Sequence, residues 1–294
     1  AEAKEPLLRK VAVGFVLRCL RGGAVDLALW DLAGKRLGEP VHRLLGGPTC
    51  ERVPAYASTL GHDVTPDAAA TQAAQYKADG YLAQKWFFRF GPRHGQDGIA
   101  KNLTMAAAVR AAVGEHYPIM FDAFMGWDVP YAIEMCRALE PLSPRWVEEP
   151  LLPEDVSGYA TLKSSTRVPI AFGEHVYGRR QVQPLLQRGV MDVVQTDPDW
   201  TGGLTELVAI CHLAAAHGKT VAPHGHTILP ALHAAATQPP SVVPMVEYLV
   251  LLQPQKQAAL TSKSEVVDGF IAIPDSPGLG IDLVDADWSV WTAA

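Results

Sequence analysis

Short apolar runs alternate with longer amphipathic stretches along most of this chain, and this alternation limits the possible fold more than any other feature. Eight strand-like runs occupy residues 53–58, 81–88, 119–124, 145–149, 168–174, 193–198, 220–225 and 242–248. Seven helical patterns separate them, at residues 66–78, 98–114, 129–139, 157–164, 178–188, 204–217 and 229–236. Strands that alternate with helices indicate a parallel α/β protein, and eight strands are the number that closes a (β/α)₈ barrel of the TIM type.

A doubly wound open sheet is the alternative arrangement for this pattern. Its first strand normally leads into a glycine-rich turn that binds a nucleotide, and no such turn follows residues 53–58. We therefore expect one barrel over residues 51–257. The ends do not share the alternation, because residues 24–37 have the pattern of an amphipathic helix and the chain after residue 257 reads as irregular with short strands. We expect residues 1–50 and 258–294 to belong to a region that packs beside the barrel.

The composition excludes several classes of function. The 294 residues carry a net charge of −6, so the chain should attract neither nucleic acid nor an anionic membrane. No apolar run approaches the roughly 20 residues of a membrane-spanning helix, and the N-terminal segment lacks the pattern of a secretion signal. A cytoplasmic location is therefore the expectation. The cysteines share no C-x-x-C spacing, and we expect free thiols at Cys19, Cys50, Cys136 and Cys211.

Acidic residues stand at the ends of three consecutive strand-like runs. These runs end in MFDAF, WVEEP and FGEH, so that Asp122, Glu148 and Glu174 follow one another at intervals of 26 residues. A barrel would bring the three carboxylates together at the C-terminal rim, where barrel enzymes have their active sites. Burying them together is costly unless a cation neutralises them, and oxygen ligands favour Mg²⁺, with Mn²⁺ as the second choice. Strand alternation should point only one of Glu148 and Glu149 inward, and the equal spacing selects Glu148.

An acid and a histidine continue this pattern at the ends of the sixth and seventh runs. Asp197 in QTDPD and His224 in APHGH would form a dyad. In such a dyad the carboxylate binds one imidazole nitrogen and raises the basicity of the ring, which leaves the other nitrogen to take a proton. On the eighth run, Glu247 in MVEYL would donate a hydrogen bond to a developing oxyanion if it stays protonated.

One lysine and three rim residues complete the set of candidates. Lys85 in AQKWFF shares a strand face with Phe87, so an inward Lys85 would place a cation near the expected metal site. Residues at the rim that we expect to contact a substrate are His175, His226 and Trp200.

In this order, these residues resemble the mandelate racemase branch of the enolase superfamily. The resemblance extends over nearly the whole chain and includes AVDLALWDLAGKRLGEPVHRLLGG near the start and DGFIAIPDSPGLGIDL near the end. Within the branch, the segments GPRHGQDGIAKN, FDAFMGWDVPYA, QTDPDWTGGLTEL and VAPHG are most similar to the rhamnonate dehydratase group. The resemblance implies a magnesium-dependent lyase that removes the proton α to a carboxylate of a sugar acid and expels a β-hydroxyl.

The resemblance also assigns roles to the candidate residues. Asp122, Glu148 and Glu174 match the metal ligands, and His224 matches the base with Asp197 as its orienting partner. Glu247 matches the acid at the end of strand eight, and Lys85 matches the first lysine of a K-x-K element. The second lysine of this element is replaced by Phe87. The family's N-terminal capping domain begins with a β-sheet ahead of the helix expected at residues 24–37, so residues 1–50 should be a remnant of that domain.

Three other functions stay open at this point. A racemase or epimerase needs a base on each face of its substrate, and Phe87 stands where the second base would be. A cycloisomerase of the muconate type would have a lysine at the position of Asp197. A catalytically weak protein that binds or senses sugar acids is the third possibility, because the cap is incomplete. We expect a homo-oligomer that acts on a small molecule.

Overall fold

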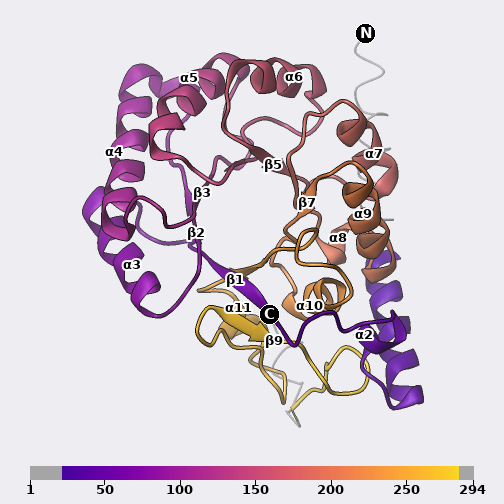
Figure 1. Cartoon of the computed structure of the whole chain (residues 1–294). Helices are drawn as coiled ribbons and strands as arrows, with labels where there is room; N and C mark the ends of the chain where they lie inside the picture. The colour runs from indigo at the N-terminus through magenta and orange to yellow at the C-terminus, as the bar shows by residue number, and fades with distance from the viewer. Residues whose placement is uncertain (1–21, 285–294) are drawn as a thin grey trace, which may run out of the picture.

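The computed structural model describes residues 22–284 of the chain. Eight parallel strands form a ring of backbone with helices around the outside (Figure 1). The strands are β1 (Arg52–Ser58), β2 (Gln84–Phe87), β3 (Ile119–Asp122), β4 (Val147–Glu148), β5 (Ile170–Phe172), β6 (Val193–Val194), β7 (Thr220–Val221) and β8 (Val246–Leu249). They are hydrogen-bonded in the order β7-β6-β5-β4-β3-β2-β1-β8. Each βα unit thus advances by one strand, as a TIM-type fold requires, and the predicted parallel α/β class is confirmed.

Helices connect the strands and cover the outer face of the sheet. The main ones are α3 (Pro66–Ala78), α4 (Gly95–Val113), α5 (Val129–Leu139), α6 (Val156–Ser165), α7 (Arg179–Gln187), α9 (Leu204–Ala216) and α10 (Ile228–Ala236). Shorter ones are α2 (Val41–Leu44), η1 (Pro92–His94), η2 (Glu140–Leu142), α8 (Pro198–Thr201) and α11 (Gln253–Lys256). The bounds predicted for α3 and α5 are correct to the residue. In α5 the signal is local, because Asp128 caps the helix by accepting the N–H of Tyr131.

All strands except β1 are shorter than the sequence predicts, and β2 to β7 end earlier than expected. β5 ends at Phe172 because Gly173 adopts a φ of 143°, which takes the chain out of the extended region. Glu149 has a φ of 38° and ends β4 in the same way. The acidic residues after these turns therefore lie on loops, where their side chains are not bound to the strict alternation of a strand.

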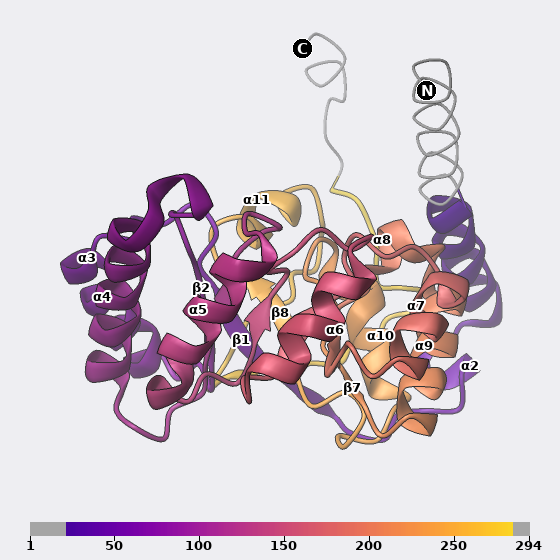
Figure 2. The ribbon, with the colours of Figure 1, turned by 90° about the horizontal axis from the view of Figure 1, so that it is seen from above.

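The N-terminal helix and the C-terminal segment pack against each other and against the barrel helices. Residues 22–37 are helical, and Figure 2 shows this helix beside α9. The Asp26 carboxylate accepts the N–H of Thr205 at 3.0 Å, and Asp31 accepts the N–H of Leu279 at 2.8 Å. The strand β9 (Phe270–Ala272) pairs antiparallel with the start of β1. The outer face of the N-terminal helix is apolar, since Val25, Leu29 and Leu32 are each about 60% exposed.

The described residues include three of the four cysteines and can be searched for a helix that could cross a membrane. No helix within residues 22–284 is long and apolar enough to cross a membrane. Cys50 is a half-buried free thiol, while Cys136 and Cys211 are buried free thiols whose pKa burial raises to about 12. The buried pair is therefore chemically inert. Cys19 lies outside the described residues.

Asp192 connects three βα units at the N-terminal side of the sheet. It accepts hydrogen bonds from the Lys163 ammonium, from the Lys219 ammonium at 3.0 Å and from the backbone N–H of Ile170 at 2.9 Å. Burial by itself would raise the pKa of Asp192, but the hydrogen bonds from Lys163 and Ile170 outweigh it and lower that pKa.

We expect Asp192→Asn to destabilise the fold at neutral pH by roughly 1–2 kcal/mol, because the amide cannot replace a carboxylate that pairs with two ammonium groups. A carboxylate whose pKa falls on folding contributes stability above its unfolded pKa of about 4, and this contribution disappears as the pH falls through the folded value. The difference in Tm between wild type and variant should therefore shrink as the pH is lowered from about 7 to about 3.

Thermal melts over that pH range provide the measurement. Asp97→Asn is the control, because Asp97 makes an ion pair with Lys101 in which it is 72% exposed, and its loss should change Tm little. A difference for Asp192→Asn that stays constant with pH would contradict the assignment.

Candidate active site

Two layers of side chains fill the inside of the sheet, and the layer at the C-terminal side is polar. The lower layer consists of Tyr56, Ala83, Met120, Trp146, Ala171, Val193, Ala222 and Met245. Two residues further along their strands, and so on the same face, lie the buried side chains of Ser58, Lys85, Asp122, Glu148, Gln195, His224 and Glu247. The candidate residues thus rest on an apolar floor, which lowers the local dielectric and strengthens every charge interaction above it.

The three expected metal ligands are buried at neighbouring strand ends. Asp122 and Glu148 are register partners on β3 and β4, and Glu174 follows β5. Their exposed fractions are 3%, 1% and 6%. Burial, which disfavours the charged form, raises the pKa of Asp122 to about 6 and that of Glu174 to about 7, and shifts that of Glu148 in the same direction. Nearby Lys85 and His224 offset only part of this effect of burial on the pKa, so further positive charge would be needed to keep all three carboxylates ionised.

Lys85 points into the barrel, as its strand face predicts. Its side chain is 1% exposed, and its ammonium contacts Asp122 at 3.1 Å, Glu247 at 2.9 Å and Glu148 at a shorter distance. These carboxylates outweigh the effect of burial, which alone would lower the pKa of Lys85, and raise that pKa well above its ordinary value. Lys85 is therefore a permanent cation at the centre of the site.

Trp146 and Gln195 hold the second oxygen of Glu148, and the sequence analysis did not identify them. The indole N–H of Trp146 donates to this oxygen at 3.1 Å, and the Gln195 amide donates at 2.5 Å. Each of the two residues lies two positions before a candidate residue, on the same inward face. The sequence signal that could have identified Trp146 and Gln195 is strand alternation, because residues two positions before Glu148 and Asp197 share their strand face.

Glu149 is buried as deeply as Glu148, with 1% of its surface exposed. The expectation that only one of this pair turns inward is wrong, because the positive φ at Glu149 ends the strand and removes the alternation there. The Glu149 carboxylate binds the Nδ1 atom of His175 at 2.9 and 3.1 Å. A second carboxylate–histidine pair therefore lies beside Glu174.

The predicted hydrogen bond between Asp197 and His224 is present. The Nδ1–H of His224 donates to Asp197 Oδ2 at 2.6 Å, and its Nε2 lies 3.1 Å from Glu174 Oε2. Burial would lower the pKa of His224, but Glu174 and Asp197 outweigh it and raise that pKa to about 10. The other oxygen of Asp197 accepts the N–H of Asp199 and so caps the short helix α8. The dyad is thus fixed to a helix start.

Glu247 is held in its ionised form by the charges around it. It is fully buried, accepts the N–H of Gly225 at 2.9 Å and faces Lys85. Burial would raise the pKa of Glu247, but the charges on Lys85 and His224 outweigh it and lower that pKa to about 2. In this arrangement Glu247 therefore accepts hydrogen bonds, whereas the role of donor to an oxyanion depends on a proton on its carboxyl group.

Aromatic rings surround the mouth of the site. The Trp200 ring lies 5.0 Å from that of His224, 5.2 Å from that of His226 and 6.1 Å from that of His175, measured between centroids. His226 also pairs with Asp199 at 2.7 Å. The three residues expected to contact a substrate are thus brought together around the dyad.

The candidate active site contains a cavity of about 100 Å³, which is lined by charged groups and by apolar side chains. Its lining residues are Leu60, Lys85, Phe87, Asp122, Phe124, Glu174, His224, Glu247 and Leu249. Sequence reasoning missed Leu60 and Phe124 on loops and Leu249 at the end of β8, because an apolar residue at such a position carries no signal that separates it from the core. Phe124 is 58% exposed and has a positive φ of 44°, so its backbone is strained at the mouth of this cavity.

The charge balance of the site suits a divalent cation. Among residues 22–284, groups of three candidate ligand atoms within 4.8 Å of one another are formed by Glu149, Glu174 and His175 and by Asp197, Asp199 and His226. The expected set does not form such a group, because Lys85 binds Asp122 and Glu148. Six carboxyl groups nevertheless lie buried around Lys85 and His224, which is more than these two cations can balance if all six are ionised: Asp122, Glu148, Glu149, Glu174, Asp197 and Glu247. An oxygen-rich site of this kind fits a hard cation.

Comparisons with known proteins agree with this arrangement. Residues 68–287 match the family described as enolase C-terminal domain-like, and residues 7–46 match the N-terminal domain of mandelate racemase and muconate lactonizing enzyme. The chain is 35% identical to an L-rhamnonate dehydratase of Saccharopolyspora erythraea over 280 residues, which cover 92% of this chain and 67% of that protein.

Two solved structures show the same fold. One is a 3,6-anhydro-D-galactonate cycloisomerase from Zobellia galactanivorans, with a TM-score of 0.81, 31% identity and coverage of 90% of this chain and 73% of that one. The other is a racemase from Streptomyces coelicolor with bound magnesium, with a TM-score of 0.80, 30% identity and coverage of 90% and 70%. The resemblance read from the sequence is confirmed: the chain belongs to the mandelate racemase and muconate lactonizing enzyme family of the enolase superfamily, and it is an enzyme of the lyase class.

Proposed function

We propose that this enzyme dehydrates a sugar acid of the aldonate type, similar to rhamnonate, to a 2-keto-3-deoxy acid with the help of Mg²⁺. The observation that carries the proposal is the His224–Asp197 pair, whose second imidazole nitrogen, Nε2, lies 3.1 Å from the buried Glu174 carboxylate. The relative named L-rhamnonate dehydratase supports the choice of reaction and of substrate class. Mn²⁺ is the second candidate for the cation.

The proposal includes a closed barrel with a capping region beside it. β7 and β8 are the two edges of the hydrogen-bonded strand order, and the N–H of Val221 on β7 donates at 2.7 Å to the carbonyl of Val242, four residues before β8. This contact supports closure over residues 51–257. The contacts of Asp26 and Asp31 support a capping region that includes residues 22–50 and against which the described part of the C-terminal segment packs.

Asp122, Glu148 and Glu174 would hold the cation. When bound there, Mg²⁺ supplies positive charge that stabilises negative charge developing on the carboxylate of the substrate. Trp146 and Gln195 orient Glu148 for this role through their two hydrogen bonds. Once Asp122 and Glu148 are neutralised in this way, the Lys85 ammonium becomes available for the carboxylate of a bound sugar acid.

His224 would perform both proton transfers. A cation held by Glu174 would neutralise the carboxylate that raises the pKa of His224, so the imidazole would then be able to give up its proton. Its Nε2 would take the proton from the carbon α to the carboxylate, while Asp197 holds Nδ1–H and stabilises the imidazolium. The same proton then passes from Nε2 to the hydroxyl on the next carbon as the C–O bond breaks and water leaves. The resulting enol tautomerises to the 2-keto-3-deoxy acid.

We expect Gln195→Leu to weaken Mg²⁺ binding by roughly tenfold or more, because Glu148 loses one of the two donors that fix its orientation. Isothermal titration of the purified protein with MgCl₂ measures this without any substrate. Thr196→Val is the matched control, because Thr196 is the next residue and its buried hydroxyl has no hydrogen-bond partner among the described residues. Equal Mg²⁺ affinity in the Gln195→Leu variant and the control would remove Gln195 from this role.

The dyad of Asp197 and His224 leads to a prediction about turnover and proton exchange. Asp197→Asn should keep the fold and Mg²⁺ binding but lower turnover by roughly 10³- to 10⁴-fold, since the amide no longer holds the productive tautomer of His224. His224→Asn should abolish both dehydration and the exchange of the α-proton with deuterated water. Proton NMR of the substrate follows this exchange. Full exchange in the His224→Asn variant would move the role of base to Lys85.

Phe87 leads to a prediction about the configuration at C2 that the enzyme accepts. Its side chain lines the cavity and cannot carry a proton, so the enzyme should accept one configuration at C2 and should not interconvert C2 epimers. Lys85→Met should lower turnover and weaken binding without changing the accepted configuration. Both epimers of an accepted sugar acid can be incubated with enzyme in deuterated water. Deuterium uptake with inversion in recovered substrate would reveal a second base and favour a racemase.

A further inference from the structure

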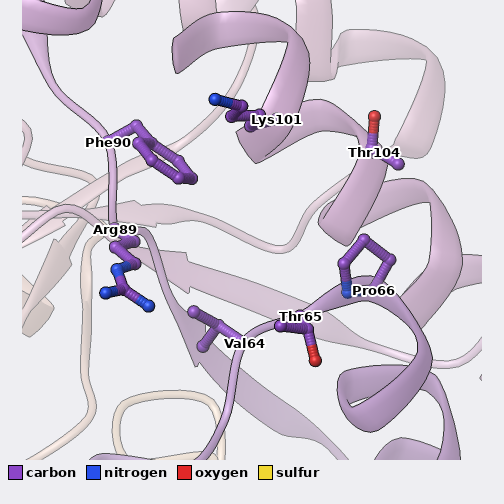
Figure 3. Close-up of a pocket in the computed structure, with 7 residues that line it drawn as sticks. All are labelled: Val64, Thr65, Pro66, Arg89, Phe90, Lys101 and Thr104. Atoms are coloured by element: carbon purple, nitrogen blue, oxygen red, sulfur yellow. The ribbon is translucent and has the colours of Figure 1, made fainter.

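A second cavity has a volume of about 270 Å³, and Figure 3 shows the residues that line it. The loop ahead of α3, the segment after β2, and α4 contribute its lining residues, which are Val64, Thr65, Pro66, Arg89, Phe90, Lys101 and Thr104. Leu60, which follows β1, and Phe87, the last residue of β2, line the first cavity, and the chain continues from them to Val64 and Arg89 in the second. The two cavities are therefore neighbours at the C-terminal side of the sheet.

The lining of the second cavity is positively charged, and no acidic residue is part of it. The exposed Arg89 side chain makes no hydrogen bond or ion pair with any residue between 22 and 284. Lys101 pairs with Asp97 at 2.6 Å, but these side chains are 54% and 72% exposed, so the pair is weak. A free guanidinium beside a weakly paired ammonium attracts an anion.

The start of α3 adds to this positive potential. The helix has 13 residues and begins at Pro66, and the side chain of its N-cap residue, Thr65, makes no capping hydrogen bond. The backbone N–H groups of a first turn carry partial positive charge and favour a nearby anion. Asp67 also belongs to this turn but is not part of the cavity lining.

The remaining walls are apolar and are held in place. Figure 3 shows the Phe90 ring between Arg89 and Lys101, with Val64 and Pro66 across the cavity. The Phe90 carbonyl accepts hydrogen bonds from the Asn102 amide at 2.9 Å and from the Trp127 indole at 3.1 Å. The aromatic wall is thus preformed, as in most small-molecule sites.

We propose that this cavity binds a small organic carboxylate with an apolar or aromatic body. The carboxylate would pair with the Arg89 guanidinium, and the body would lie on the Phe90 ring against Val64 and Pro66. An inorganic anion has no part that fills the apolar side, and a neutral aromatic molecule leaves Arg89 without a partner. The volume lies just below the range of drug-sized ligand sites and so restricts the ligand to a small molecule. This inference does not depend on the proposed dehydratase activity.

Benzoate is the probe, and isothermal titration in the presence of EDTA measures its binding to the whole chain. The dissociation constant should be on the order of 1 mM. Arg89→Gln should raise it at least tenfold by removing a charge-assisted pair, and Thr104→Phe should do the same by filling the cavity. Arg93→Gln is the matched control, because Arg93 is an exposed arginine on the same segment that does not line the cavity. All these side chains are exposed, so unchanged melting temperatures should accompany the variants.

Three comparisons distinguish this site from its alternatives. Benzoate should bind the Asp122→Asn variant as well as it binds wild type; loss there, with retention in Arg89→Gln, would place the ligand in the first cavity and overturn the proposal. Benzyl alcohol of the same shape should bind much more weakly, and equal binding would refute the anionic requirement. Inorganic phosphate should also bind weakly, and binding equal to that of benzoate would refute the requirement for an apolar body. Absence of binding by benzoate at millimolar concentrations would end the proposal.

Discussion

The buried charge of Lys85 is the interaction on which the rest of the site depends. Its ammonium lies inside the sheet among Asp122, Glu148 and Glu247, which come from three other strands. Without a cation, these carboxylates would repel one another, and burying each would cost several kcal/mol. Lys85 therefore allows β2, β3, β4 and β8 to bring their C-terminal ends together around a polar layer. It also supplies only part of the charge that the layer needs, which is why a further cation fits.

An apolar floor makes this polar layer possible. The larger side chains of the floor, such as Tyr56, Met120 and Trp146, fill the sheet beneath the charges and exclude water from below. The hydrophobic contacts of the floor and of the outer helices stabilise the fold, so the polar layer does not have to. Trp146 takes part in both layers, because its ring belongs to the floor while its indole N–H reaches Glu148.

The sequence was sufficient for those features that depend on periodicity. The number of strands, the parallel class and the bounds of α3 and α5 follow from local patterns of apolar and capping residues. The approach of His224 to Asp197 follows from their places at adjacent strand ends. Features that depend on one backbone angle were not predictable, and the burial of Glu149 through its positive φ is the clearest case.

Charge states and apolar walls also escaped the sequence analysis, for a different reason. The ionised state of Glu247 depends on the distance to Lys85, which exists only once β2 and β8 are placed in the same ring. The loop residues Leu60 and Phe124 have the same apolar character as core residues, so composition alone cannot assign them to a cavity. The short helix α8 was missed because four residues are too few to show a helical period.

Asp197 has one oxygen on His224 Nδ1 and the other on the first turn of α8, the helix that carries Trp200. One carboxylate thus sets both the orientation of the imidazole and the starting point of the segment that forms an aromatic wall beside it. The orientation of His224 and the position of Trp200 therefore depend on the same carboxylate, and an insertion or deletion between residues 197 and 201 would disturb both. Trp200 itself can be exchanged for another side chain while the helix start is kept. Within a family of related enzymes, the side chain at position 200 can therefore change with the substrate. Asp197 and the start of α8 have to be kept for the proton transfer.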